Sequence, residues 1–557
     1  MHDSLFSRHE ERLAGALDAL KSRGHWDAFP EVPSRKIYGE DAASEGETAF
    51  KARLDRPFEI DQPGTLGRVG NEISPYGFPL GIGYPRAEPS ELIRAAETAM
   101  SRWSEAPLAE RAGVCLEVLE RLNERSFELA FATMHTTGQG YVMAFQSGGP
   151  HAQDRGLEAL AYAYQEVAAI PESSLWIKRF GKGEVIRLRK RYRTMPRGVG
   201  LVIACSTFPT WNAYPGLFAD LMTGNAAIVK PHPGAVLPLA VTVEVARGVL
   251  VEAGFDPNLV TLAADSEDEP LAKELASRPE VRIVDYTGGS EFGEWLERNA
   301  RQAALFTEKS GVNSIVIDSV DDLRATAENI AFSLSLYSGQ MCTTSQNVFI
   351  PRSGIDTRDG RAGYDDVTSA IVDAVDRLLS DPARAADVLG CIKSEATLAR
   401  LASAKGEGVR VLRETRRVAN SEFPEARVRS PLILEVEPSN EGAYMREMFG
   451  PVSYVIPTRD TDHGLALAAR AARVKGAITG AVYSTDDAVV ERAEKILAGA
   501  GVPVSFNLTG PIWVNQAAAF SDYHVSGANP AGSATLCDAA FVAPRFRIVQ
   551  SRIPADG

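Results

Sequence analysis

Hydrophobic residues recur every three or four positions over residues 90–139, which predicts a pair of amphipathic helices. The same spacing predicts a further helix over 155–170. The pattern then changes, because apolar residues alternate with basic ones over 185–192 and indicate an extended arm. A buried strand is predicted next, at 200–205. The chain thus passes from a helical region into a sheet.

Short apolar segments alternate with helical ones over the next three hundred residues. This alternation is typical of parallel βαβ units, so we predict an α/β fold with helices on both faces of its sheet. A second α/β block follows at 365–501. The predicted strands are 226–231, 259–264, 281–288, 314–319 and 347–351, and the predicted helices are 236–254, 269–278, 292–302 and 323–337.

Composition narrows the class of protein. The net charge of 59 − 73 = −14 argues against nucleic acid as the main partner. No apolar run approaches the length of a membrane span, and the first residues lack the apolar core of a signal peptide. The five cysteines form no CxxC pair and no metal-binding spacing with the eight histidines. We therefore expect a cytoplasmic protein without a metal, with neither nucleic acid nor a membrane as partner.

Cys342 has unusual neighbours for a cysteine. It lies in "YSGQMCTTSQ", beside Gly339, Gln340, Thr343 and Thr344. A structural cysteine is usually a small buried hydrophobe, whereas a reactive thiol needs an open turn and nearby hydrogen-bond donors. The surroundings favour the reactive interpretation without excluding the structural one.

Two further candidates lie just after the first buried strand. Prolines on both sides of Trp211 and Asn212 predict an extended turn, at a place where ligands bind in α/β folds. The Asn212 amide could donate to an oxyanion or simply cap the turn. Lys230 ends the next strand and suits a phosphate or a ribose, although a solvated surface lysine has the same pattern.

Three other segments could carry chemistry. The glycine turn at 287–289, followed by Gly293, could bring backbone N–H groups to an anion, but it lacks the GxGxxG spacing and a plain strand–helix connection fits equally well. Glu308 could be a general base or a surface charge. Glu447 and Phe449 precede a Gly–Pro turn and a buried strand.

The order of these segments carries more information than any one of them. It resembles the aldehyde dehydrogenase superfamily over roughly residues 85–550, and the interval of 34 residues between Glu308 and Cys342 is typical of that family. The resemblance implies NAD(P)-dependent oxidation of an aldehyde to an acid. The ordered segments are Asn212, Lys230, TGG at 287–289, Glu308, GQxC at 339–342 and ExFGPV at 447–452.

The resemblance also implies a role for each residue. Cys342 would attack the aldehyde to form a thiohemiacetal and then a thioester. Asn212 and the Cys342 backbone N–H would hold the oxyanion, and Glu308 would activate the hydrolytic water. The residues implied to contact the cofactor are Trp211, Lys230, His232, Thr287, Gly288, Gly289, Gly293, Glu447 and Phe449.

The fold that the resemblance implies has two interleaved parallel-sheet α/β domains and a β-arm for oligomerisation, so we expect a homodimer or homotetramer. The Rossmann-like cofactor domain is predicted over 61–310, with the arm at about 175–196, and the catalytic domain over 311–505. Residues 1–60 would be a helical extension. Residues 506–557 would complete the cofactor domain and the arm.

Two departures from the family pattern affect the cofactor and the catalytic segment. The usual KPSE reads KPHP, so Pro233 stands where a glutamate often binds the adenosine ribose. Without that carboxylate, Lys230 and His232 could attract a 2′-phosphate, so we predict NADP rather than NAD. The usual ELGGK reads EKSGV, which keeps Glu308 but changes the residues after it.

The substrate prediction rests on the C-terminal region. Residues 514–552 and the preceding "NLTGP", together with "KPHPGAVLPLA" and "CSTFPTWNAYPGL", resemble the phenylacetic acid degradation (PaaN-type) aldehyde dehydrogenases. This implies a ring-opened semialdehyde-CoA, 3-oxo-5,6-dehydrosuberyl-CoA semialdehyde, and a dehydrogenase without a fused hydratase. Nine Lys or Arg over 178–197 could steer CoA phosphates or pair with a neighbouring subunit, and the second interpretation is favoured.

Three alternatives remain open at this point. An acylating, CoA-dependent aldehyde dehydrogenase would share the fold but usually lacks a base such as Glu308. A cysteine hydrolase would need a histidine as base, for which His232 and His524 are candidates. A catalytically silent relative is disfavoured because Asn212, Glu308 and Cys342 are all present.

Overall fold

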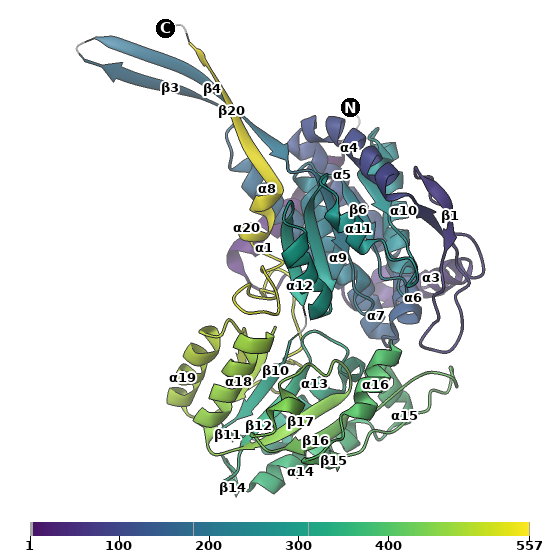
Figure 1. Cartoon of the computed structure of the whole chain (residues 1–557), viewed down its shortest axis with the longest axis vertical. Coiled ribbons are helices and arrows are strands. Elements are labelled where there is room, and N and C mark those ends of the chain that lie inside the picture. The colour runs from purple at the N-terminus through teal and green to yellow at the C-terminus, as the bar shows by residue number, and fades with distance from the viewer. Residues whose placement is uncertain (1–3, 182, 310, 556–557) are drawn as a thin grey trace.

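The computed structural model describes residues 4–181, 183–309 and 311–555, so the outermost residues of the predicted terminal segments and two internal positions lie outside the description. Two parallel sheets form the cores of two bodies, and a long β-arm extends from one of them (Figure 1). In Figure 1 the upper body is mostly purple and teal, and the lower body is mostly green. The predicted α/β fold is confirmed.

The upper body is built on a five-stranded parallel sheet in the order β7-β6-β5-β8-β9. The carboxyl ends of parallel strands share one edge, so Lys230, Gly288 and Glu308 lie along the same side of the sheet. Ligands of open α/β sheets bind at this edge, near the point where the strand order reverses. The strands are β5 (Val199–Ile203), β6 (Ala227–Lys230), β7 (Val260–Leu262), β8 (Val281–Gly288) and β9 (Ala304–Lys309).

The helices that connect these strands differ in one respect from the prediction. Trp211 and Asn212 are in the first turn of a helix, not in an extended turn. The reason is that Pro209 is the first residue of that helix, where its fixed φ is favourable and its missing N–H costs nothing. The connecting helices are α9 (Pro209–Met222), α10 (Leu237–Glu252), α11 (Ala272–Ser277) and α12 (Ser290–Asn299).

The N-terminal third is helical and packs against this body. The region predicted as two helices, 90–139, contains three, because the chain breaks at Pro107 and again at Arg125. Periodicity alone did not reveal the second break, since the apolar spacing continues across it. The helices are α1 (Leu5–Ser22), α2 (Arg35–Tyr38), α3 (Ala42–Lys51), α4 (Pro89–Glu105), α5 (Leu108–Glu124), α6 (Ser126–Thr137), α7 (Tyr141–Gly148) and α8 (Pro150–Ala168), and a small hairpin pairs β1 (Thr65–Val69) with β2 (Tyr84–Ala87).

The lower body has a seven-stranded sheet in the order β15-β16-β17-β12-β10-β18-β19, in which only the β15–β16 pair is antiparallel. Its strands are β10 (Asn313–Ile317), β12 (Ser345–Pro351), β15 (Val409–Arg413), β16 (Leu432–Val436), β17 (Val452–Thr458), β18 (Gly480–Tyr483) and β19 (Val504–Phe506), and a side sheet contains β11 (Ser319–Val320), β13 (Ile355–Thr357) and β14 (Gly360–Ala362). Its helices are α13 (Leu323–Ser335), α14 (Tyr364–Leu378), α15 (Pro382–Leu389), α16 (Glu395–Ser403), α17 (Glu441–Tyr444), α18 (Thr461–Lys475) and α19 (Asp487–Ala498).

The arm is a three-stranded antiparallel sheet in which the C-terminal strand takes part. It contains β3 (Ser173–Phe180), β4 (Glu184–Pro196) and β20 (Phe546–Pro554), in the order β20-β4-β3. Figure 1 shows it projecting away from both bodies, as the alternating pattern predicted for an extended arm.

The chain returns from the lower body to the arm through residues 507–538, which contain little regular structure, and through α20 (Ala539–Val542). This returning segment brings His524 to the boundary between the two bodies. Among the helices of the described residues, none has both the length and the apolar character that spanning a membrane requires.

Candidate active site

Cys342 lies between a strained turn and the start of β12. The turn is η2 (Leu336–Gly339), a short 3-10 helix in which Tyr337 and Ser338 have positive φ angles of 52° and 48°. Non-glycine residues adopt this conformation only where their surroundings enforce it, and such strain often occurs at functional sites. Here the Tyr337 hydroxyl donates to the Thr137 carbonyl at 2.6 Å, and the Ser338 hydroxyl donates to the Leu389 carbonyl at 2.9 Å.

The turn is also held on the far side of the cysteine. The Asn313 side-chain amide donates to the carbonyl oxygens of Cys342 at 2.7 Å and Thr344 at 3.0 Å. These hydrogen bonds hold the backbone around the cysteine in place. Cys342 itself is only partly buried.

Glu308, at the end of β9, receives two hydrogen bonds that place it next to the cysteine. Asn212 Nδ2 donates to Glu308 Oε2 at 2.9 Å, and His524 Nε2 lies 2.9 Å from Oε1. The same His524 Nε2 lies 3.9 Å from Cys342 Sγ. The structure thus brings together Asn212, Glu308 and Cys342, and adds His524 between the last two.

Burial and charge act in opposite directions on this cluster. Burial alone would raise the pKa of Glu308, but the charge and hydrogen bond of His524, with the donors around it, hold that pKa below its ordinary value. Burial first, and the Glu308 carboxylate second, act to raise the pKa of Cys342 well above that of a free thiol. A thiolate at Cys342 therefore needs a nearby positive charge.

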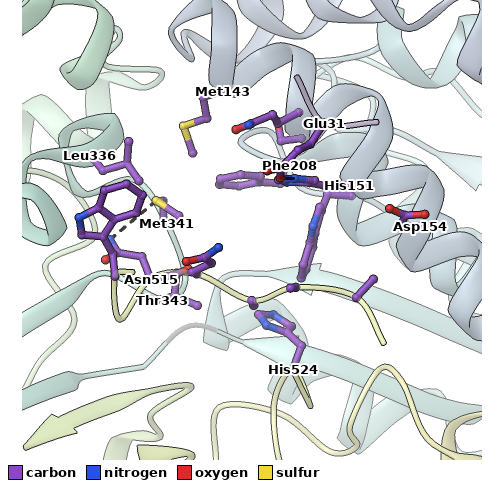
Figure 2. A pocket seen from close by; sticks show the side chains of 18 of the residues that line it. Glu31, Met143, His151, Asp154, Phe208, Leu336, Met341, Thr343, Asn515 and His524 are labelled. Atoms are coloured by element: carbon purple, nitrogen blue, oxygen red, sulfur yellow. Dashed lines mark hydrogen bonds and ion pairs between the residues drawn. The ribbon is translucent and has the colours of Figure 1, made fainter. Parts of the chain in front are cut away.

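A cavity of about 550 Å³ leads to the cysteine from one side. Figure 2 shows Met143, Phe208 and Met341 around the hollow and His524 below it. The N-terminal extension contributes Asp27 and Glu31 to the cavity wall, a contribution that the sequence did not reveal. The apolar and aromatic residues of the wall are Trp26, Val142, Met143, Phe208, Trp211, Phe332, Leu336, Met341, Val388, Pro511, Trp513, Ala517, Ala518 and Ala519.

A second, smaller hollow borders Cys342 together with Glu447 and Phe449. The loop that carries them is fixed by Arg400, whose Nε donates to the Phe449 carbonyl at 3.0 Å. Cys342 therefore lies between two hollows.

The predicted adenosine corner has different electrostatics from those expected. Lys230 Nζ donates to Asp265 Oδ1 at 2.7 Å, so its charge is already balanced by a buried carboxylate. Burial and two nearby lysines lower the pKa of His232 to about 4, which makes this imidazole neutral at pH 7. The prediction that His232 supplies a positive charge is therefore wrong.

Lys393 supplies a charge that the sequence did not suggest. Its Nζ donates to the Gly234 carbonyl at 2.7 Å, beside the KPHP segment, and burial lowers its pKa to about 8. At pH 7 this lysine is mostly protonated. It lies more than 150 positions away in the chain, which explains why sequence patterns did not indicate it.

The glycines after β8 differ in the space around them. The segment contains Thr287, Gly288, Gly289 and, in α12, Gly293. A Cβ on Gly288 would meet the Tyr286 hydroxyl at 2.4 Å, and one on Gly293 would meet the Lys309 side chain at 2.6 Å. A Cβ on Gly289 would meet nothing within 4 Å. Gly289 precedes α12 directly, so the open surface for an anion is at the helix N-terminus.

In a comparison with known protein families, residues 84–535 match the aldehyde dehydrogenase family. The chain belongs to the aldehyde dehydrogenase family. The superfamily resemblance found in the sequence is confirmed at this level.

Individual relatives differ in how similar they are to this aldehyde dehydrogenase. A crystal structure of an NAD-dependent aldehyde dehydrogenase from Burkholderia multivorans is 53% identical, with each chain covered completely and a TM-score of 0.98. The succinate-semialdehyde dehydrogenase [NADP(+)] of Deinococcus radiodurans is 26% identical over 84% of this chain and 88% of its own length. The 1-pyrroline-5-carboxylate dehydrogenase of Geobacillus kaustophilus is also 26% identical, but the match spans 60% of this chain and only 63% of that relative.

Proposed function

We propose that this protein oxidises an aldehyde to a carboxylic acid, with Cys342 as nucleophile and a nicotinamide dinucleotide as hydride acceptor. The carrying observation is that Cys342, Glu308 and Asn212 meet at one end of a large cavity while Cys342 also borders a second hollow. An aldehyde in the cavity and a cofactor on the Glu447 side would reach the same sulfur.

The residues at the carboxyl edge of the five-stranded sheet fit such a cofactor. Gly289 leaves the N-terminus of α12 open for a phosphate, Lys230 ends β6, and Glu447 and Phe449 lie beside Cys342. When bound, the dinucleotide would accept a hydride from the carbon attached to Cys342.

The chain's own residues account for the other steps. Cys342 Sγ would bond to the carbonyl carbon, and the negative charge on oxygen would be held by the Cys342 backbone N–H and the Asn212 amide, each donor worth roughly 10²–10³ in rate. Asn212 Nδ2 donates one of its two hydrogens to Glu308, which leaves the second hydrogen for the oxygen. Glu308 would then take a proton from water, whose oxygen displaces Sγ from the thioester and releases the acid.

The test is absorbance of reduced nicotinamide, with a medium-chain aldehyde and either NADP or NAD. We expect reduction that depends on Cys342 and disappears in Cys342→Ala. Equal rates in the variant and the unaltered protein would contradict the proposal. Product analysis in the presence of free CoA distinguishes this reaction from that of an acylating aldehyde dehydrogenase, which would form a CoA thioester. We expect the free acid, because the buried Glu308 would activate water.

For the substrate we propose the ring-opened semialdehyde-CoA of phenylacetate degradation, on the strength of the C-terminal resemblance. The cavity of about 550 Å³, with apolar and aromatic walls, supports an acyl chain of medium length, with the CoA portion outside. The expected result is a kcat/KM for the CoA-linked semialdehyde at least tenfold above that for a plain semialdehyde of equal length. Equal values would show that CoA is not recognised.

The basic stretch 178–197 supports subunit contact better than CoA binding. None of its described residues lines the cavity, and β4 projects with the arm away from the two bodies (Figure 1). We propose that the arm joins subunits of a homodimer or homotetramer. Neutralising Arg187, Arg189 and Arg191 should change the oligomeric state in sedimentation and leave the KM ratio of CoA-linked to plain aldehyde unchanged.

We retain NADP as the preferred cofactor, with Lys393 rather than His232 as the charge that recognises the 2′-phosphate. Pro233 leaves no carboxylate at that position to repel it. Lys393→Met should lower kcat/KM for NADP about tenfold and leave NAD nearly unchanged. In the unaltered protein the preference for NADP should weaken above pH 8, because Lys393 then loses its proton. A stronger rate with NAD at pH 7 would overturn this assignment and agree with the Burkholderia multivorans relative.

A further inference from the structure

His524 is held in a fixed position between two acidic groups. Its Nε2 lies 2.9 Å from Glu308 Oε1 and 3.9 Å from Cys342 Sγ, and the residue is only 2% exposed. The Trp211 ring meets the imidazole edge-on, with 4.7 Å between ring centroids, and the His524 backbone N–H donates to Cys537 Sγ at 3.4 Å. The imidazole therefore has little freedom to leave this place.

The proposed chemistry places two negative charges close together, and a positively charged imidazole between them would offset their repulsion. The proposed reaction needs Glu308 as a carboxylate and Cys342 as a thiolate, and two anions in one buried site repel each other. Burial opposes the thiolate further. Within the described part of the chain, His524 is the group able to carry a positive charge that lies at hydrogen-bond distance from Sγ.

Other charged groups near this imidazole are already paired. Arg155 donates to Glu158 at 2.7 Å and to the carbonyl oxygens of Ala517, Ala518 and Asp522. Its charge therefore faces Glu158 and the backbone. Two more thiols face the site and remain neutral, since burial raises the pKa of Cys205 and raises that of Cys537 to about 11.

We propose that His524 is a further catalytic residue of this enzyme, which in its protonated form lies between the Glu308 carboxylate and the Cys342 thiolate and allows both anions to exist together. This inference rests on the proposed function for its role in turnover, but the ion pair itself forms without substrate or cofactor. A Cys–His pair of this kind lowers the pKa of a thiol in other cysteine enzymes.

The proton balance of the activation step is simple. The Sγ–H bond of Cys342 breaks and its electron pair stays on sulfur. Because Nε2 already carries the hydrogen that it donates to Glu308 Oε1, the proton goes to Nδ1, the unprotonated nitrogen of the neutral imidazole. The imidazolium Nε2–H then lies between Oε1 and Sγ. When water later displaces Sγ from the thioester, the electron pair of the C–S bond returns to a sulfur that already faces a cation.

The first test needs no variant of His524. We would titrate the ultraviolet absorbance of the thiolate in the unaltered protein against Cys342→Ala, without aldehyde or cofactor. The expected difference signal has a midpoint at least one pH unit below the ordinary thiol value of about 8.5. A midpoint at or above that value would overturn the proposal.

The second test uses His524→Gln, with His135→Gln as matched control. His135 is another buried imidazole, packed against Phe50 with 4.9 Å between ring centroids, and it lies outside the site. His524→Gln should raise the thiolate midpoint by at least one unit and slow alkylation of Cys342 by iodoacetamide at pH 7 at least tenfold. The control should change neither. Unchanged values in His524→Gln would leave the imidazole with a packing role only.

The two proposals fail in different ways. A low thiolate midpoint without aldehyde oxidation would refute the proposed function and keep the ion pair. Aldehyde oxidation with an ordinary midpoint would keep the function and refute the role of His524. Should His524→Gln not fold, the titration of the unaltered protein still decides.

Discussion

Two buried clusters in this molecule share one design, a basic side chain between two acidic groups. In the first, Arg545 donates to Asp220 at 2.7 Å and to Asp285 at 2.6 and 2.8 Å. In the second, His524 lies between Glu308 and Cys342.

Their surroundings differ. Phe306 and Phe541 cover the Arg545 guanidinium at 4.4 and 4.2 Å from their ring centroids, and Arg545 is fully buried. His524 instead lines a cavity of about 550 Å³. Arginine stays protonated at any physiological pH, whereas histidine titrates near neutrality. A sealed cluster with a permanent charge holds the fold together, and an accessible cluster with a titratable cation can move protons.

The largest effect is expected at the accessible cluster. Glu308→Gln removes the proposed base for hydrolysis but leaves the proposed nucleophile, so steady-state turnover should fall by about 10²–10⁴. Rapid mixing with aldehyde and cofactor should still show a burst of reduced nicotinamide equal to the enzyme concentration. Loss of the burst together with turnover would mean that Glu308 acts before the thioester forms.

At the sealed cluster the effect should fall on stability. Arg545→Met leaves two buried carboxylates without their cation, and we expect the free energy of unfolding to decrease by about 3–5 kcal/mol. Denaturant titration measures this. The control is Arg547→Met, a change in the exposed arm strand that should cost no more than about 0.5 kcal/mol. Equal losses in both variants would contradict the structural role of Arg545.

The third effect is a pH dependence of stability, which is the smallest of the three when it is compared over a single pH unit. Burial, and secondarily the nearby Asp285 carboxylate, raise the pKa of Asp220 to about 7, although Arg545 opposes this. Between about pH 4 and 7 the folded protein then keeps a proton that the unfolded chain has lost. Stability from this group is therefore complete at low pH and declines by about 1.4 kcal/mol per pH unit toward pH 7.

Asp220→Asn isolates this contribution. The unfolding free energy of the variant should lack the pH dependence that Asp220 contributes. The difference in unfolding free energy between the unaltered protein and the variant should therefore change over pH 4–7 and stay constant above pH 7. Denaturant titrations at several pH values give the difference. A difference that is constant over the whole range would show that Asp220 is ionised in the folded protein.

Much of the fold could be predicted from local pattern. The strands at 226–231, 281–288 and 347–351 were found within a few residues, because buried parallel strands leave short apolar runs between turns. The errors came where two signals compete. Prolines around Trp211 suggested a turn, yet Pro209 begins a helix, and Pro215 is accommodated inside it.

The site divides in the same way. Asn212, Glu308 and Cys342 were chosen from their order and spacing, and the structure brings their side chains together. Asp265 and Lys393 left no pattern, since each acts on the KPHP segment through the tertiary fold. The contacts of the predicted cofactor residues with a dinucleotide stay a prediction.

The sequence by itself determined the order of the α/β units, because that order depends on the periodicity of apolar residues. The order and spacing of its motifs led to the family, and from the family to the prediction that Cys342 is the nucleophile. Only the tertiary structure decided which charges are free. His524 lies 182 positions from Cys342 and 216 from Glu308, and the return of the chain through residues 507–538 places it between them. The strength of an ionic interaction depends on distance and burial, and neither quantity is written in the order of the residues.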